Sequence, residues 1–219
     1  MKTLTLRNGV EMPVLGLGTL QSSSEECINA IHAALDAGNT LIDTVSISKN
    51  EEDIGKALES YFETGKLSRK DVFITTRVWS DYNPPEDVEK TLREKLKALR
   101  TDYVDLYLIH QPPEFMEENN EMTTRLNNTW KAMEEVYKKG LAKSIGGSNF
   151  SVSLFESIMP ICEVPFHILQ VEQKKFFDEG LEGLIDDCRN EKIFFTMFNP
   201  LRSSVMMKVF HSERGLLSQ

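Results

Sequence analysis

The chain has 219 residues, of which 40% are hydrophobic and 27% are charged, a composition typical of a globular protein with one sizeable core. Its formal net charge of -9 disfavours non-specific binding to nucleic acid or to an anionic membrane. No run of 18 apolar residues predicts a membrane span, and the first residues contain no apolar core of signal-peptide length, so we expect a cytoplasmic protein. Three isolated cysteines, Cys27, Cys162 and Cys188, predict reduced thiols and no metal site.

The first predicted element is a β-hairpin. Extended runs over residues 4–6 and 10–12 flank the tripeptide Arg7-Asn8-Gly9. An Asn-Gly pair between two extended runs is a strong hairpin signal, because both residues accept the positive φ angles of a tight turn.

Short apolar runs of strand length then recur along the chain, at residues 13–18, 40–43, 72–76, 105–109, 143–146, 167–171 and 193–198. Between some of them, apolar residues repeat at three- and four-residue spacing, which predicts amphipathic helices over residues 25–37, 85–100 and 129–139. This alternation predicts an α/β fold with a parallel sheet, and the near-continuous apolar strands indicate that both faces of the sheet are buried. An eight-stranded barrel and a doubly wound open sheet both satisfy the pattern.

The stretch from Leu41 to Leu58 carries a more specific motif. An apolar strand ends in Asp43-Thr44, Ser48 follows five residues after the aspartate, and Asn50-Glu51 opens a helix. This arrangement resembles the signature of the aldo-keto reductases, in which a tyrosine occupies the position of Ser48. The resemblance extends over about residues 4–201 and favours a TIM-type (β/α)8 barrel whose bottom is closed by the N-terminal hairpin.

The resemblance implies a catalytic site. In the family a nicotinamide hydride attacks a carbonyl, a tyrosine donates a proton, a lysine paired with an aspartate lowers the pKa of that tyrosine, and a histidine orients the carbonyl. The aspartate and histidine positions hold Asp43 and His110, whereas the tyrosine and lysine positions hold Ser48 and Arg77. A serine hydroxyl is shorter and less acidic than a phenol, and a guanidinium keeps its proton. We therefore interpret Asp43 and Arg77 as a structural ion pair.

The resemblance also implies substrate and cofactor positions. Substrate contacts are expected from Trp79, His110 and Gln111, the last of which stands where the family usually has tryptophan. The segment Gly146-Gly147-Ser148-Asn149-Phe150 resembles the family's Gly-x-Ser-Asn-Phe, whose serine and asparagine bind the nicotinamide carboxamide. The implied NADP(H)-binding residues are Gly18, Thr19, Asp43, Ser148, Asn149, Gln170 and Phe198. Nothing beyond Leu201 resembles the motif that holds the 2′-phosphate, so we expect weakened cofactor binding.

The predicted strands number seven, and the last ends at Phe198, followed by a divergent tail over residues 202–219. Because a (β/α)8 barrel typically needs ~250 residues, we expect a single domain over residues 1–219 that lacks its last βα unit. A truncated product, a fragment and a protein whose gap is covered by another chain are all consistent with this. An open barrel has two unpaired edges, which self-association or a partner would cover.

Three functions follow from these observations. The first is a protein related to NADP(H)-dependent carbonyl and aldehyde reductases with weak or no activity, because Ser48 and Arg77 replace the catalytic pair. The second is an active NADPH-dependent oxidoreductase that uses His110 or a water as the acid, with a small carbonyl compound as substrate. The third is a non-enzymatic binding protein built on the same scaffold.

Overall fold

The computed structural model describes residues 2–19, 24–44, 50–78, 85–110, 120–173, 176 and 182–199, with the backbone alone at 120–123 and 182. The N-terminal element is an antiparallel hairpin of β1 (Thr3–Thr5) and β2 (Glu11–Pro13). In its turn Gly9 has a φ of 85°, as the Asn-Gly pair predicts. The predicted hairpin is confirmed.

In the described part of the chain the main sheet contains seven parallel strands, each paired with the next one along the chain. They are β3 (Leu17–Gly18), β4 (Leu41–Asp43), β5 (Phe73–Val78), β6 (Leu106–Ile109), β7 (Ile145–Ser148), β8 (Ile168–Glu172) and β9 (Phe194–Phe198). The α-helices between them are α1 (Ser24–Asp36), α2 (Glu51–Glu63), α3 (Val88–Ala98), α4 (Asn120–Lys138), α5 (Val152–Ile158) and α7 (Glu182–Asn190). Short 3-10 helices are η2 (Arg69–Asp71), η3 (Pro85–Asp87) and η4 (Met159–Ile161).

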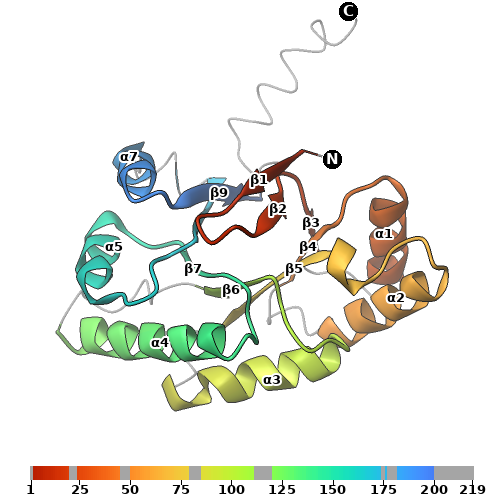
Figure 1. Ribbon diagram of the computed structural model, residues 1–219, viewed down its shortest axis with the longest axis horizontal. Helices are drawn as coiled ribbons and strands as arrows, with labels where there is room; N and C mark the ends of the chain where they lie inside the picture. The colour runs from red at the N-terminus through yellow and green to blue at the C-terminus, as the bar shows by residue number, and fades with distance from the viewer. Residues whose placement is uncertain are drawn as a thin grey trace, which may run out of the picture.

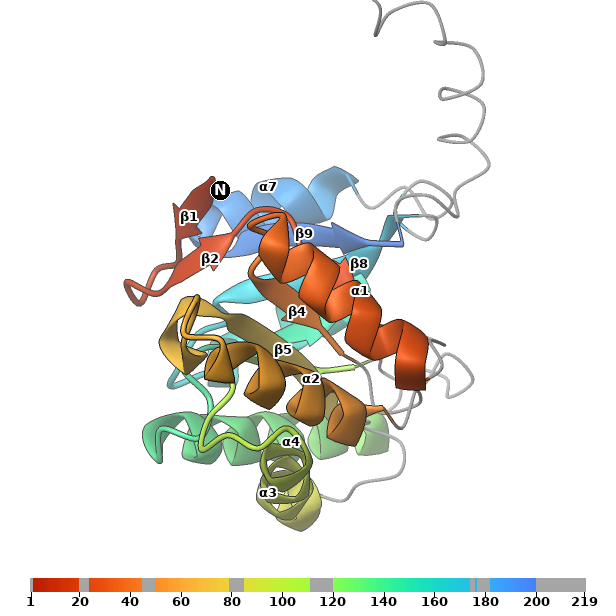
Figure 2. The same cartoon turned by 90° about the vertical axis from the view of Figure 1, so that its right-hand side faces the viewer.

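The order of the strands distinguishes the two candidate folds. A doubly wound sheet reverses its order at a switch point, whereas here the order follows the chain from β3 to β9. The sheet curls, with the helices on its outer side and the hairpin at one end (Figures 1 and 2). Within the described residues β3 and β9 are the two edges of the sheet. The prediction of a TIM-type barrel that is incomplete, with seven strands and an N-terminal hairpin, is confirmed.

Two hydrophobic clusters hold the fold together. The inner cluster is enclosed by the sheet and contains Leu6, Met12, Leu41, Phe73, Leu106, Leu108 and Ile168. Four of these are the first residues of β4, β5, β6 and β8, so the hairpin residues Leu6 and Met12 close the N-terminal end of the barrel. The outer cluster lies between the strands and the helices, and in it the ring of Trp130 stacks on that of Phe166 at 3.8 Å.

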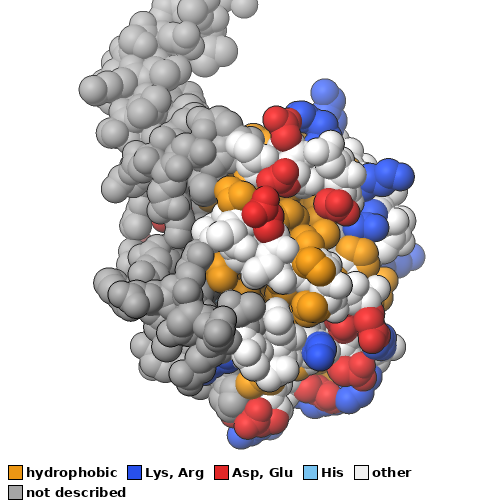
Figure 3. Space-filling model, turned by 90° about the vertical axis from the view of Figure 1, so that its left-hand side faces the viewer, with side chains coloured by type: hydrophobic (Ala, Val, Ile, Leu, Met, Phe, Trp, Pro, Cys, Tyr) orange, Lys and Arg blue, Asp and Glu red, His pale blue; other side chains and the backbone are white. Residues whose placement is uncertain are grey.

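Several predicted boundaries were wrong. The strand expected over residues 13–18 is divided: Pro13 ends β2, where the Val14 N–H donates to the Lys2 carbonyl at 3.1 Å, and only Leu17–Gly18 join the main sheet. Val14 and Leu15 between them are 55% and 64% exposed. Helix α4 begins at Asn120 rather than 129, and its polar first half offers little apolar periodicity. The short helices α5 and α7 were not predicted. Hydrophobic side chains still reach the surface on the side of the molecule where α5 and α7 lie, among acidic and basic ones (Figure 3).

The prediction that the three cysteines are unpaired is confirmed. Cys27, Cys162 and Cys188 are all free, and burial raises the pKa of Cys162 and Cys188 to about 12. These two thiols therefore stay protonated and unreactive at neutral pH. As for a membrane span, none of the helices in the described ranges combines the length and the hydrophobicity that one requires.

Candidate active site at the carboxyl ends of the strands

The residues singled out from the sequence gather at one rim of the barrel. Asp43, Ser148 and Phe198 are the last residues of β4, β7 and β9, and His110 directly follows β6. Because all strands of the main sheet are parallel, their carboxyl ends meet at the same rim, where TIM-type barrels carry their active sites. The described candidates at this rim are Gly18, Thr19, Asp43, Arg77, His110, Ser148, Asn149, Gln170 and Phe198.

Asp43 and Arg77 form a two-pronged ion pair. The Arg77 Nη1 donates to Asp43 Oδ1 at 2.6 Å, and Nη2 donates to Oδ2 at 2.8 Å. The Arg77 side chain is 5% exposed and that of Asp43 is 16% exposed. A carboxylate at such a site needs a compensating charge, and the bidentate guanidinium supplies it. The predicted pairing is confirmed.

Arg77 also reaches the residue expected to bind the cofactor amide. Its Nη2 donates a short hydrogen bond to Gln170 Oε1, and its Nη1 donates to the Thr44 carbonyl at 2.7 Å. The Gln170 Nε2 in turn donates to Asp43 Oδ2 at 3.4 Å. The guanidinium carbon lies 5.9 Å from the centre of the Phe198 ring, within cation–π range. Arg77 therefore joins β4, β5 and β8 and contacts the end of β9.

His110 lies in the same rim, where its backbone N–H donates to the Val78 carbonyl at 2.8 Å. Burial, followed by the positive charge of Arg77, lowers the pKa of His110 to about 4. The imidazole is therefore neutral at pH 7. A neutral imidazole can orient a carbonyl through a hydrogen bond, but it rarely carries a second proton to transfer.

The residues of β7 fit a nicotinamide carboxamide only in part. The Ser148 hydroxyl is fully buried and has no hydrogen-bond partner among the described residues, so a polar group of a ligand would satisfy it. Asn149 has a φ of 58°, and its Oδ1 accepts from the Glu172 N–H at 2.9 Å. The acceptor oxygens of Asn149 and Gln170 thus already have partners within the protein.

Gly18 and Thr19 lie beside Asp43. In the sheet register Gly18 pairs with Asp43, and the Thr19 N–H donates to the Asp43 carbonyl at 3.1 Å. Asn50, which opens α2, donates from Nδ2 to the Thr19 carbonyl at 2.7 Å. The side chain of Asn50 therefore fixes the start of α2 to the end of β3, a role that the sequence did not reveal.

A buried ion pair near the rim was also missed. The Lys95 Nζ lies 2.9 Å from Glu51 Oε1, with the two side chains 8% and 11% exposed. The available signal was the position of Lys95 on helix α3, three residues after Leu92 and so on the apolar face of the predicted helix. Three predicted site residues, Ser48, Trp79 and Gln111, lie outside the described residues.

Comparison with known proteins identifies the family. The profile described as "Aldo/keto reductase family" matches residues 14–216. Aldo-keto reductase family 1 member A1 from Gallus gallus is 34% identical over 228 residues, which cover 99% of this chain and 69% of that protein. Its Mus musculus counterpart is 35% identical, covering 92% of this chain and 65% of that protein. The chain belongs to the aldo/keto reductase family, and it spans about two thirds of the length of these curated relatives.

Solved structures agree with this assignment. The aldose reductase from Schistosoma japonicum superposes with a TM-score of 0.82 and 32% identity, over 97% of this chain and 75% of that one. An aldo-keto reductase from Bombyx mori in complex with NADP superposes with a TM-score of 0.79 and 29% identity, over 91% of this chain and 66% of that one. The resemblance first seen in the Asp43 motif is confirmed for the family and the fold.

Proposed function

We propose that this chain is a relative of the NADP(H)-dependent carbonyl and aldehyde reductases whose own reductase activity is weak or lost. The observation that carries the proposal is the hydrogen bonding of Arg77, which binds both oxygens of Asp43 and the amide oxygen of Gln170. In the family's chemistry the lysine at this position tunes a tyrosine. Here the guanidinium is occupied by acceptors of the protein, and Ser48 stands at the tyrosine position.

Neither replacement supports proton transfer to a carbonyl. A guanidinium stays protonated and presents a planar fork suited to carboxylates, so Arg77 stabilises Asp43 rather than poising an acid. An aliphatic hydroxyl at Ser48 is a weaker acid than a phenol and is shorter. General acid catalysis accelerates such reactions roughly 10²–10⁴-fold. Its loss alone therefore reduces the turnover rate to a small fraction of the rate of a site with an intact acid.

Weakened cofactor binding belongs to the same proposal. A bound nicotinamide cofactor supplies the hydride in this family, and Ser148 offers a buried hydroxyl for its carboxamide. The oxygens of Gln170 and Asn149 would have to exchange or share their present partners, Arg77 and the Glu172 N–H, to join that contact. Each exchange costs part of the binding free energy, because a hydrogen bond is broken for each one made.

The direct test mixes the purified full chain with NADPH and a panel of aliphatic and aromatic aldehydes, and follows NADPH absorbance. We expect no consumption above the protein-free background. Calorimetric titration with NADPH alone measures cofactor affinity independently of chemistry. Turnover at rates ordinary for the family, abolished by His110→Ala, would reject the proposal.

A second candidate function is an active reductase that uses His110 as the acid. The Ser148 hydroxyl favours it, because that hydroxyl has no partner among the described residues and could bind a polar group of the cofactor. The pKa of about 4 at His110 argues against it, since the protonated imidazole is scarce at neutral pH. This candidate requires detectable NADPH binding, and a calorimetric titration with no heat would end it.

The third candidate, a binding protein without catalysis, draws on the free edge of β9 within the described residues. It predicts self-association or a partner at that edge, and sedimentation showing only monomer would count against it. A cytoplasmic location stays a prediction from the sequence.

A further inference from the structure

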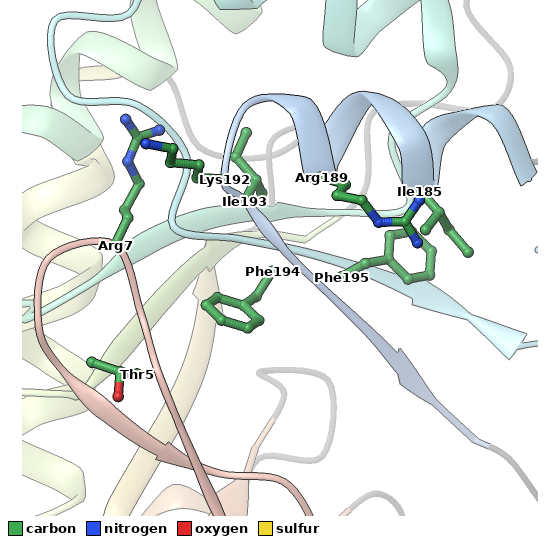
Figure 4. Close-up of a pocket in the computed structure, with 8 residues that line it drawn as sticks. All are labelled: Thr5, Arg7, Ile185, Arg189, Lys192, Ile193, Phe194 and Phe195. Carbon is green, nitrogen blue, oxygen red and sulfur yellow. The ribbon is translucent and has the colours of Figure 1, made fainter.

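A cavity of about 680 Å³ lies at the barrel end opposite the candidate active site, beside the start of β9 (Figure 4). Three parts of the fold line it: the hairpin, helix α7, and the turn that leads into β9. The described residues that line it are Thr5, Arg7, Ile185, Arg189, Lys192, Ile193, Phe194 and Phe195. From its position and lining we infer that this cavity binds a small amphipathic anion, a carboxylate carried on an aliphatic or aromatic body.

The apolar part of the cavity follows the edge of β9 that pairs with no other strand of the described ranges. Phe194 packs with the inner cluster and Phe195 with the outer one, as alternate residues of a strand must. Two side chains on opposite faces of a strand line one cavity only where that cavity reaches around the edge of the strand. Ile193, 4% exposed, and Ile185 on α7 complete the apolar wall.

The charged part of the cavity is cationic. The Arg7 Nη1 donates to the Glu191 carbonyl at 3.1 Å, which places the guanidinium at the turn that carries Lys192. Lys192 has a φ of 57°, and the turn is held by the Lys192 N–H, which donates to the Arg189 carbonyl at 3.1 Å, and by the Ile193 N–H, which donates to the Cys188 carbonyl at 2.7 Å. A single carboxylate that accepts from both Arg7 and Lys192 would be held by two charge-assisted hydrogen bonds. In a chain of net charge -9, such a local cationic site favours an anionic ligand.

Within the described residues no ion pair joins Arg7 or Lys192 to an acidic side chain, although the exposed Glu191 is next to Lys192 in the chain. Asp186 pairs with Arg189 at 2.6 Å, and Glu11 accepts from the Thr5 hydroxyl. Arg189 thus has an acidic partner on its own helix, and it lies one turn from Ile185 on the same side of α7. The head group of the ligand is assigned to Arg7 and Lys192, and its apolar body to Phe194, Phe195 and Ile193.

The backbone of β9 adds a donor. The Phe194 N–H points toward β8, where it donates to the His167 carbonyl at 3.1 Å. Because successive residues of a strand direct their N–H groups to opposite sides, the Phe195 N–H points away from β8, toward the edge of β9 along which the cavity lies. The volume lies in the usual range of ligand pockets, about 300–1,000 Å³, and an apolar lining with a few convergent polar groups is their usual composition.

Octanoate is a suitable probe, with 1-octanol as the uncharged molecule of the same chain length. Calorimetric titration of the full chain with octanoate, without nicotinamide cofactor, should show one saturable site that weakens as salt is added. The double variant Arg7→Gln/Lys192→Gln should bind octanoate at least about tenfold more weakly, since it loses two charge-assisted contacts. 1-Octanol should bind wild type and double variant alike.

The matched control removes the same charge elsewhere. Lys97 and Lys131 are exposed residues of α3 and α4, and Lys97→Gln/Lys131→Gln should bind octanoate like wild type. Lys192→Gln alone, at an exposed position, serves as the test if thermal melts show that the double variant unfolds. Absence of saturable binding, or equal affinity of the cavity and control variants, overturns the inference. If the protein is a dimer that does not bind octanoate and is not dissociated by it, the cavity is assigned to contact with a second copy, and the inference is overturned as well.

Discussion

Arg77 holds both carboxylate oxygens of Asp43, and it does so from the neighbouring strand with the same guanidinium that binds Gln170 across the barrel. A lysine ammonium at this position is a single point charge and cannot occupy both Asp43 oxygens and Gln170 in one plane. Arg77 therefore joins β4, β5 and β8, and under the proposed function this replaces the tuning of a proton donor. The consequences can be measured separately as stability and as activity.

Removal of the Arg77 charge should destabilise the fold. The Asp43 side chain is 16% exposed. In Arg77→Met it loses its cationic partner and keeps only the Gln170 amide, at 3.4 Å. We expect the free energy of unfolding, measured by urea denaturation, to fall by about 3 kcal/mol, the scale for breaking a buried pair by deleting one partner. Arg77→Lys should lose less, because it keeps the charge.

The control for this variant is an exposed ion pair. Lys66 and Asp36 lie 2.6 Å apart with side chains 59% and 53% exposed, and Lys66→Met should leave the free energy of unfolding within measurement error. If Lys66→Met lowered the free energy of unfolding as much as Arg77→Met, the buried Asp43–Arg77 pair would stabilise the fold no more than an exposed ion pair does.

Restoring the family's acid should restore activity only when both positions change. Ser48→Tyr supplies a phenol but leaves Arg77 bound to Asp43, and Arg77→Lys supplies an ammonium with no phenol to tune. We expect Ser48→Tyr/Arg77→Lys to reduce aldehydes roughly 10²-fold faster than wild type, with both single variants near the wild-type rate. NADPH consumption with one aromatic aldehyde measures all four proteins.

Adding His110→Ala to the double variant is the control, because the gained activity should then disappear. A double variant that binds NADPH in calorimetry and yet stays inactive would show that proton delivery is not what this site lacks.

The part of the site that sequence could predict is the part carried by strand ends. Asp43, Arg77 and His110 each follow an apolar run, and parallel strands bring such positions to one rim. That Asp43 pairs with Arg77 was implied by the family resemblance. The contact from Arg77 to Gln170 was not predicted, because it spans 93 positions and exists only once the sheet has curled β8 toward β5. Local sequence patterns contain no information on that closure.

The fold shows the same division. Buried strands and the Asn-Gly turn were predicted from local chemistry, whereas Val14 and Leu15 look like strand residues and are exposed in the structure. Helix α5 has seven residues, too few for a helical period to be read from its sequence. Lys95 on an apolar helix face was a usable signal for a buried ion pair, since a lysine is rarely buried without a partner.

Gly146 is required by the close approach of two strands. A Cβ built at this position would lie 2.1 Å from the Ile168 carbonyl oxygen, which belongs to the backbone of β8 and cannot move aside without breaking the ladder. We expect Gly146→Ala to lower the free energy of unfolding by about 2–3 kcal/mol.

Gly183→Ala on helix α7 is the matched control, because a Cβ there meets nothing within 4 Å. We expect this variant to raise the free energy of unfolding by about 0.5 kcal/mol. Equal effects of the two variants would contradict the steric argument.

Two buried histidines should make the fold sensitive to mild acid. His167 is 2% exposed and His110 lies in the candidate site, and in both cases burial is the main cause of a pKa lowered to about 4. An unfolded histidine titrates near pH 6.5, so above that pH both states are neutral and neither histidine contributes. Between pH 6.5 and pH 4 the unfolded state binds the proton and the folded state does not. Stability is therefore lost as the pH falls through this window.

His167→Gln isolates one of these contributions. One histidine with a folded-state pKa of about 4 lowers the free energy of unfolding by about 2.5 kcal/mol when the pH falls from about 7 to about 4.5. The variant should lose about that much less than wild type over the same range, while carboxylates titrate equally in both proteins and cancel in the difference. Urea denaturation at several pH values measures it, and His110→Gln repeats the test at the rim. Parallel pH curves for wild type and His167→Gln would mean that the folded protein admits the proton at His167 as readily as the unfolded chain does.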